Sequence, residues 1–301
     1  MVVSKKMDKR YFHYTSLKCL YSIISDSELW FANLKNSNDP NEFSLSCEEY
    51  NDYIEKLNIN PYHGYPMILN NNNVLKYPYG ISFTTLNDNL SQWERYGDDL
   101  KGVAIEFDID FLQSYLDKKF NFKFEFGSVK YDEVEKIKFI KKKVNEIKDV
   151  PNYIYELHWP IYAIYFIMHF AQARALFKSL SFCAENEYRL FFDPKEYEFY
   201  HNTILQFKEI NGNSVEESIR DYNYNKEIIH FLEQDKKFAL MRSGINSYLP
   251  LNLNLFGKEK GSLIKQIVLG PKCTQSIDEL KEFLLVNGYE PSVSRSIIQI
   301  M

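Results

Sequence analysis

The chain has few cysteines, and their spacing excludes two common uses of that residue. Its four cysteines, Cys19, Cys47, Cys183 and Cys273, are far apart and form no CxxC pair. Zinc sites built on cysteine depend on such pairs, so the sequence indicates no zinc site of that type. The amino-terminal stretch MVVSKKMDKR is charged and lacks the apolar core of a secretory signal. We therefore expect a cytoplasmic protein with reduced thiols.

Long apolar runs and an excess of positive charge are also missing. The most apolar run, residues 157–170, contains two histidines and a proline, and it is shorter than the roughly 20 residues of a membrane-spanning helix. It predicts a buried helix and no membrane partner. The formal net charge is −5, which argues against an extended surface that follows a phosphate backbone.

The motifs of several enzyme classes are absent from the sequence. It contains no GxGxxG, no Walker loop, no GxSxG and no HExxH. Nucleotide binding on a glycine-rich loop, hydrolysis by a serine elbow and zinc proteolysis are therefore not indicated.

Strand and helix patterns alternate irregularly along the 301 residues, without steady βαβ order. This favours an α+β fold with mixed, largely antiparallel sheets and flanking helices. We expect a single domain over 1–301, with a helical insertion at about 130–180. The patterns predict strands at 10–15, 29–33, 80–85, 103–108, 182–192, 248–256, 263–270 and 292–300, and helices at 17–26, 48–58, 90–96, 130–149, 152–180, 226–242 and 276–288.

The stretch FCAENEYRLFF, residues 182–192, is the most informative in the chain. If it is a strand, Glu185, Glu187 and Arg189 share one face, because strand side chains alternate with period two. Tyr188, Leu190 and Phe192 take the other face and are apolar enough for a core. The pattern is typical of a cleft floor, or alternatively of a surface ladder in which Arg189 pairs with a glutamate.

Other polar groups form a candidate constellation with these two glutamates. They are His13, Tyr14 and Thr15 at the end of the first strand, Asn38-Asp39-Pro40 with Glu42 in a loop, Ser82 and Thr84 on a middle strand, and Trp93 and Tyr96 on a short helix. Each of these groups also has a purely structural explanation. His13 can bond a buried backbone group, Trp93 and Tyr96 can be core residues, and Asp39-Pro40 can be a turn.

The motifs HYTS, LWFAN, NDPNE, ISFTTLNDNLSQWERYGDDLKGVAIEFD and ENEYRL occur in this order. They resemble a widespread bacterial family known only as a domain of unknown function, over roughly residues 10–200 plus the carboxyl-terminal IVLGP and final strand. More distantly, a His-x-Thr strand followed by a helix and a short strand resembles ADP-ribosyltransferases, including the DarT-type DNA-modifying toxins.

The second resemblance implies an ADP-ribosyltransferase-like core and NAD as a substrate. In that superfamily a first strand carries a His or Arg, a second strand a Ser, Thr or Tyr, and a late strand a Glu. Here His13, Ser82 with Thr84, and Glu187 would take these three places. Glu187 would stabilise the ribosyl cation and Glu185 would orient or deprotonate the acceptor.

The same resemblance implies that eight residues would contact NAD: His13, Tyr14, Thr15, Ser82, Thr84, Trp93, Tyr96 and Arg189. No metal is required. The acceptor, a nucleic acid or a protein, is not identified by the sequence. The resemblance further suggests a toxin or phage-defence effector with an antitoxin or defence partner.

Two other functions remain open on the residues. Asp39, Glu42, Glu185 and Glu187 could converge on Mg²⁺ in a metal-dependent nuclease, although no catalytic lysine is obvious. The aromatic residues could instead line the cleft of a non-catalytic module that binds a nucleotide or a partner.

Overall fold

The computed structural model describes residues 9–39, 78–120, 124–148, 175–192, 237–241 and 244–300. Within them the strands are β1 (Tyr11–Thr15), β2 (Glu28–Asn33), β3 (Tyr79–Thr84), β4 (Val103–Phe107), β5 (Glu125–Ser128), β6 (Glu187–Phe192), β7 (Lys237–Met241), β8 (Gly244–Asn252), β9 (Ile264–Leu269) and β10 (Ser292–Arg295). The α-helices are α1 (Leu17–Ser25), α4 (Leu90–Tyr96), α5 (Ile109–Phe120), α6 (Glu133–Lys148) and α12 (Ile277–Val286). The 3₁₀-helices are η1 (Leu34–Asn36), η2 (Leu180–Glu185) and η4 (Leu253–Ser262).

All ten strands belong to one open sheet. Its main path runs β10-β9-β4-β1-β3-β2-β8-β7, and β6 pairs with β3 and β5 beside that path. Among the strand pairs of the described residues, only β9 with β10 is parallel. The fold is therefore α+β with a largely antiparallel sheet, as the sequence predicts.

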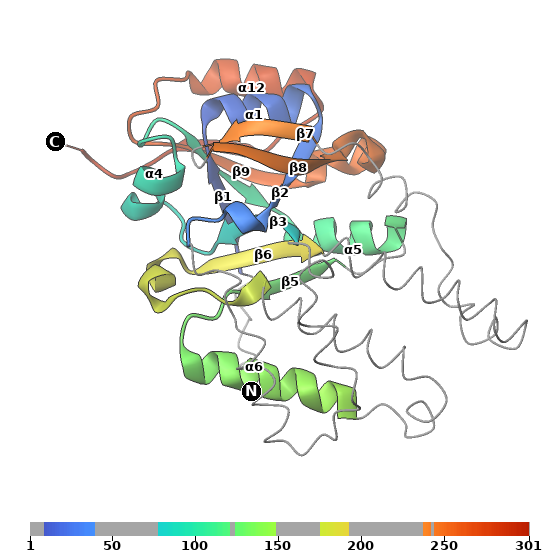
Figure 1. Ribbon diagram of the computed structural model, residues 1–301. Coiled ribbons are helices and arrows are strands. Elements are labelled where there is room, and N and C mark those ends of the chain that lie inside the picture. The colour runs from blue at the N-terminus through green and yellow to red at the C-terminus, as the bar shows by residue number, and fades with distance from the viewer. Residues whose placement is uncertain are drawn as a thin grey trace, which may run out of the picture.

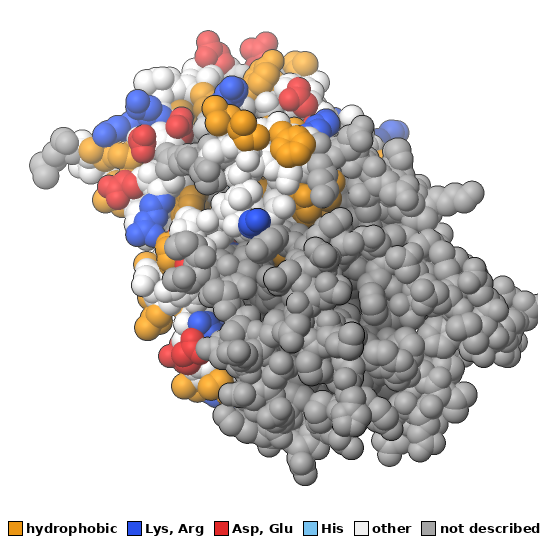
Figure 2. All heavy atoms as spheres, in the orientation of Figure 1, with side chains coloured by type: hydrophobic (Ala, Val, Ile, Leu, Met, Phe, Trp, Pro, Cys, Tyr) orange, Lys and Arg blue, Asp and Glu red, His pale blue; other side chains and the backbone are white. Residues whose placement is uncertain are grey.

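One face of the sheet forms the main hydrophobic core. Alternate residues of the central strands, such as Phe31, Ile81, Ile105 and Leu190, point to this face and are buried. Helices α1 and α12 cover it and lie side by side (Figure 1), where Tyr21 stacks on Phe283. Figure 2 shows apolar side chains mixed with charged ones over these two helices.

The opposite face is different in character. Strand register places Ser82 opposite Arg189 and Thr84 opposite Glu187, and paired residues of an antiparallel ladder project to the same side. Part of this face is covered by α4, whose Trp93 packs with Phe12 and Tyr14 in a smaller apolar cluster. The polar residues of β3 and β6 therefore lie on the face away from the main core.

Several expected elements form because local sequence and tertiary partners agree. Helix α1 begins after Ser16, whose hydroxyl accepts a hydrogen bond from the Cys19 amide at 3.1 Å, as an N-cap does. Residues 90–96 form α4 as predicted. In β6 the expected apolar side is confirmed, because Leu190 and Phe192 are in the core and Tyr188 packs against it.

Other expectations are wrong. Residues 237–241 form β7 rather than the end of a helix over 226–242, because β8 supplies backbone partners for them. The strand predicted to reach residue 256 ends at Asn252, whose side chain accepts from the Asn254 amide and starts η4. The helix predicted to reach residue 180 ends earlier, since Phe177 bridges to Lys130.

The sequence patterns also do not predict helix α5 or strand β5. The helix expected at 48–58, most of the one at 152–180 and the apolar run 157–170 lie outside the described residues. In the part of the chain that the structure covers, no helix has the length and apolar character needed to cross a membrane.

Candidate functional site

A cavity of about 820 Å³ lies on the face of the sheet opposite the main core. Strands β2, β3, β6 and β8 contribute Trp30, Ser82, Glu187 and Asn246 to its lining, and α4 contributes Tyr96. The volume is within the roughly 300–1,000 Å³ of ligand pockets in proteins. It can hold a molecule of nucleotide or dinucleotide size.

Glu187 is the first residue of β6 and is buried, with 7% of its surface exposed. Arg189, two residues along the same strand face, donates to both carboxylate oxygens, from Nε to Oε1 at 2.7 Å and from Nη2 to Oε2 at 3.0 Å. The exposed residue Ser82 pairs with Arg189 across the ladder, and its side chain helps to lower the pKa of Glu187. The pair of Arg189 with a glutamate is thus present, but it is buried rather than on the surface.

The charge state of Glu187 follows from these contacts. Burial alone raises the pKa of this carboxyl group, but the charges of Arg189 and Lys178 outweigh it, together with hydrogen bonds from Arg189 and Ser82. They lower the pKa of Glu187 to about 2. Glu187 is therefore a fixed carboxylate at neutral pH.

Glu185 reaches the same cluster by a route that strand periodicity does not predict. It ends η2, and Asn186 then takes the left-handed conformation, with φ 46° and ψ 50°, which asparagine tolerates better than most residues. The expectation that Glu185 lies on the strand is therefore wrong. Its backbone carbonyl accepts from Thr84 Oγ1 at 2.9 Å and from Gln92 Nε2 at 3.2 Å, which fixes this turn against β3 and α4.

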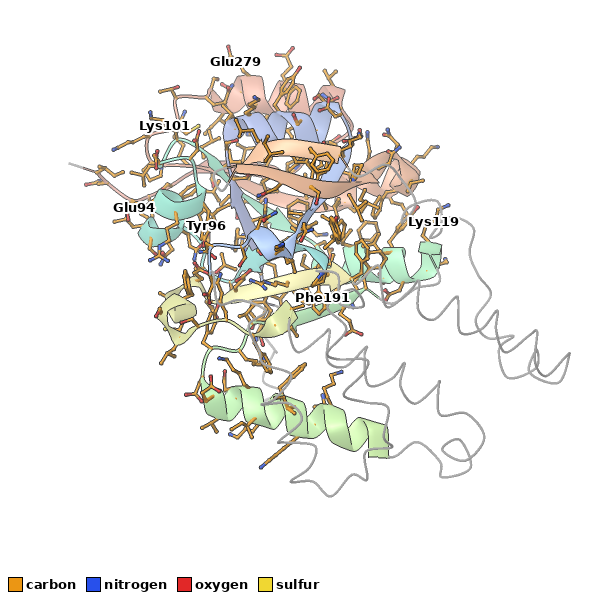
Figure 3. All side chains as sticks on the ribbon, viewed as in Figure 1. Glu94, Tyr96, Lys101, Lys119, Phe191 and Glu279 are labelled. Atoms are coloured by element: carbon orange, nitrogen blue, oxygen red, sulfur yellow. The ribbon has the colours of Figure 1, made fainter. Side chains whose placement is uncertain are left out.

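The carboxylate of Glu185 is fully engaged by its neighbours. Its Oε1 accepts from Tyr96 Oη at 2.5 Å and from Asn38 Nδ2 at 2.8 Å. Figure 3 labels Tyr96 on α4, which lies above β6 in this view. Burial and the hydrogen bond to Glu185 raise the pKa of Tyr96, so its hydroxyl stays a donor.

Lys178 joins the two glutamates, and sequence reasoning missed it. Its Nζ donates to Glu185 Oε2 at 2.6 Å and to Glu187 Oε2 at 3.1 Å, while its side chain is only 2% exposed. It also lies over the Phe182 ring. No local pattern marks this lysine, because its position depends on η2 folding back over β6.

The Asn38-Asp39 motif attaches a distant loop to this cluster. Asn38 donates to Glu185 and, at 2.6 Å, to Tyr96 Oη. Asp39 is buried and its Oδ2 accepts from the Ser179 amide at 2.7 Å. Both residues therefore fix the segment that carries Lys178 and Glu185. Pro40 and Glu42 lie outside the described residues.

His13 borders the cavity, but its ring is directed by a backbone contact. Phe12 pairs with Thr84, so the neighbouring His13 shares a side with Phe83, and its ring contacts Phe83 and Phe107. Nδ1 donates to the Ser82 carbonyl at 2.9 Å. Burial lowers the pKa of His13, against the effect of that hydrogen bond. The imidazole thus holds β1 to β3 at the point where Ser82 and Glu187 meet.

Of three other candidates, Trp93, Tyr14 and Thr15, only Tyr14 borders the cavity. Trp93 is fully buried, donates to Asp88 at 2.8 Å and is not part of the cavity lining. Tyr14 borders the cavity, but its hydroxyl donates to the Leu86 carbonyl and accepts from the Asn89 amide. Thr15 ends β1 opposite Val103 and is not part of the cavity lining.

The donor set of the cluster suits ion pairing better than metal binding. Across the described residues, no three histidine, cysteine, aspartate or glutamate side chains gather in a way that could hold a metal ion. The Lys178 ammonium also occupies the position between the two carboxylates where a cation would bind.

The segment from α4 to β6 carries the similarity of this chain to known proteins. A family model described as protein of unknown function (DUF2971) matches residues 92–190. The matched segment includes Tyr96, Lys178 and the two glutamates, but not His13 or Asn38. Neither the curated proteins nor the solved structures gave a match.

Proposed function

We propose that the cavity binds NAD and that the protein is an NAD-consuming, ADP-ribosyltransferase-like enzyme in which Glu187 stabilises the ribosyl cation. The observation that carries the proposal is the placement of Glu187. It is a buried carboxylate, ionised at neutral pH, that lines a cavity large enough for a dinucleotide together with the exposed residue Ser82. The sequence resemblance to ADP-ribosyltransferases assigns the same two residues to the reaction.

The reaction places a demand on charge that Glu187 can meet. When the bond between nicotinamide nitrogen and ribose C1′ breaks, both electrons leave with nicotinamide and positive charge develops on the sugar. A carboxylate already fixed in place stabilises that charge without reorganising during the step. Lys178 and Arg189 keep Glu187 ionised and oriented despite its burial.

Ser82 and Tyr96 complete the proposed site. Ser82 is exposed and borders the cavity together with Glu187, so its hydroxyl can form a hydrogen bond with a ribose hydroxyl beside the carboxylate. Tyr96 is half-buried and borders the cavity, and it gives the nicotinamide a ring to pack against. The acceptor, a protein or nucleic-acid group, would form the new bond to C1′ and release its proton to solvent.

The contacts of Glu185 favour a positioning role over proton transfer. Both of its carboxylate oxygens carry short hydrogen bonds from Tyr96, Asn38 and Lys178. A base that takes a proton from the acceptor would have to give up one of these. We therefore assign Glu185 to fixing Lys178 and Tyr96 around Glu187.

The proposal is tested by incubating the purified protein with labelled NAD, with and without cell extract. Nicotinamide release is measured by chromatography, and label transfer is measured on protein and on nucleic acid. Glu187→Gln should lower release at least ~100-fold, since loss of one such electrostatic group costs about 2.7–4 kcal/mol. Ser82→Ala, which removes no buried charge, should lower it about tenfold, because a hydrogen bond to a charged group is worth about 1.5–3 kcal/mol.

Folding is checked by thermal melting, with Lys237→Met as the control. Lys237 pairs with Glu28 on the surface, so its replacement should leave turnover unchanged. Equal release by wild type and both site variants would refute the role of Glu187 and Ser82. NAD binding without turnover would support the non-catalytic binding module. Cleavage of DNA or RNA that stops on adding EDTA would support the nuclease.

A further inference from the structure

The cavity has two chemically different ends. The charged lining residues come from α4 and from the segment that includes η2 and β6: Glu94, Arg95, Lys178, Glu185, Glu187 and Arg189. The lining residues that β2, η1 and β8 contribute within the described chain are not ionisable, and three of them are asparagines. A ligand that fills the cavity therefore meets ions at one end and amides with an aromatic ring at the other.

Trp30 forms the aromatic wall of the uncharged end. One side of its indole stacks on Tyr248, with ring centroids 4.1 Å apart and planes inclined by 23°. Trp30 borders the cavity and Tyr248 does not. Tyr248 thus supports the indole from behind, and the cavity side of the ring is the side that a planar ligand can stack on.

Asn246 supplies hydrogen-bonding groups next to this wall. Ala32 pairs with Tyr248, and Asn246 follows two residues away on the same side of β8. It is buried and borders the cavity. The small side chain of Ala32 leaves room between the indole and this amide. An asparagine amide offers a donor and an acceptor side by side, as the N6 and N7 edge of adenine does.

We infer that the uncharged end of the cavity is a subsite for a purine base, formed by Trp30 and Asn246. On the proposed function, on which this inference rests, the base is the adenine of NAD and the nicotinamide riboside lies at Glu187. Strands β8, β2, β3 and β6 are neighbours in that order, so the two ends are two to three strand spacings apart, roughly 10–15 Å. The two ribose–phosphate units of a dinucleotide can bridge that span.

The test is equilibrium binding of NAD, AMP and nicotinamide mononucleotide, measured by calorimetry on wild type and Trp30→Leu. Base stacking on an aromatic side chain is worth about 1–3 kcal/mol, so Trp30→Leu should weaken NAD and AMP about 5- to 150-fold. Nicotinamide mononucleotide, which has no adenine, should bind the variant within twofold of wild type. Trp30→Phe should restore most of the affinity, and Asn246→Ala should also weaken AMP.

Tyr21→Leu is the matched control, because Tyr21 is an exposed aromatic residue stacked on Phe283 and outside the cavity lining. It should leave all three affinities unchanged. NAD turnover with a Trp30→Leu variant that binds NAD normally would overturn the subsite and leave the proposed function standing. If Trp30→Leu abolishes AMP binding but the wild-type protein never consumes NAD, the subsite stands and the proposed function is overturned. Failure of wild type to bind AMP or NAD would overturn the subsite.

Discussion

Replacement of Lys178 by methionine should destabilise the protein far more than replacement of any surface lysine. Lys178 donates to Glu185 at 2.6 Å and to Glu187 at 3.1 Å, and its side chain is almost fully buried. Methionine keeps the length of the side chain but leaves two buried carboxylates with fewer partners. Removing one member of a buried ion pair costs about 3–5 kcal/mol, which is a large part of the 5–15 kcal/mol that holds a typical domain folded.

The assay is urea unfolding at pH 7, followed by circular dichroism, with Lys237→Met as the control. Lys237 makes a 2.7 Å pair with Glu28, but its side chain is 48% exposed, so its loss should cost at most about 1 kcal/mol. The double variant Lys178→Met, Glu185→Gln should lose less than the sum of the two single losses, because the residues interact. Equal losses for Lys178→Met and Lys237→Met, at unchanged m value, would refute the view that Lys178 is the central ion of a buried network.

Three further predictions test the fold around the site. The pKa of Glu187 is about 2, below its ordinary 4.5. Its charge therefore contributes ~3 kcal/mol to the free energy of unfolding above about pH 4.5, and this contribution is lost as pH falls towards 2. Glu187→Gln should flatten this part of the stability profile, measured by urea unfolding at several pH values. Gly80→Ala should cost about 1–3 kcal/mol by chemical denaturation, because an added Cβ would lie 2.9 Å from Phe191 Cβ, and an unchanged midpoint would contradict the close packing of β3 on β6. Ser16→Ala should cost about 1 kcal/mol by removing the N-cap of α1, and Ser16→Asp, which can still accept the bond, should restore most of it.

The sequence by itself determined the elements whose patterns are local. The N-cap at Ser16 and the apolar spacing after it predict α1, and the alternation from Glu187 to Phe192 predicts which side of β6 enters the core. Asn38, Ser82 and Tyr96, which the sequence offers as candidates, all border the cavity. The predictions of α1 and of the buried side of β6 succeed because a side chain's direction in a regular helix or strand follows from its position in the repeat.

Only the tertiary structure decided how those residues are used. Glu185 reaches Glu187 through the left-handed turn at Asn186 and not along a strand, and the chain folding back at η2 brings Lys178 between them. Likewise β7 is a strand because β8 lies beside it, and His13 turns towards the Ser82 carbonyl rather than towards the glutamates. In each case the decisive partner is distant in sequence or lies across an irregular turn, so its effect on conformation and charge exists only once the chain has folded.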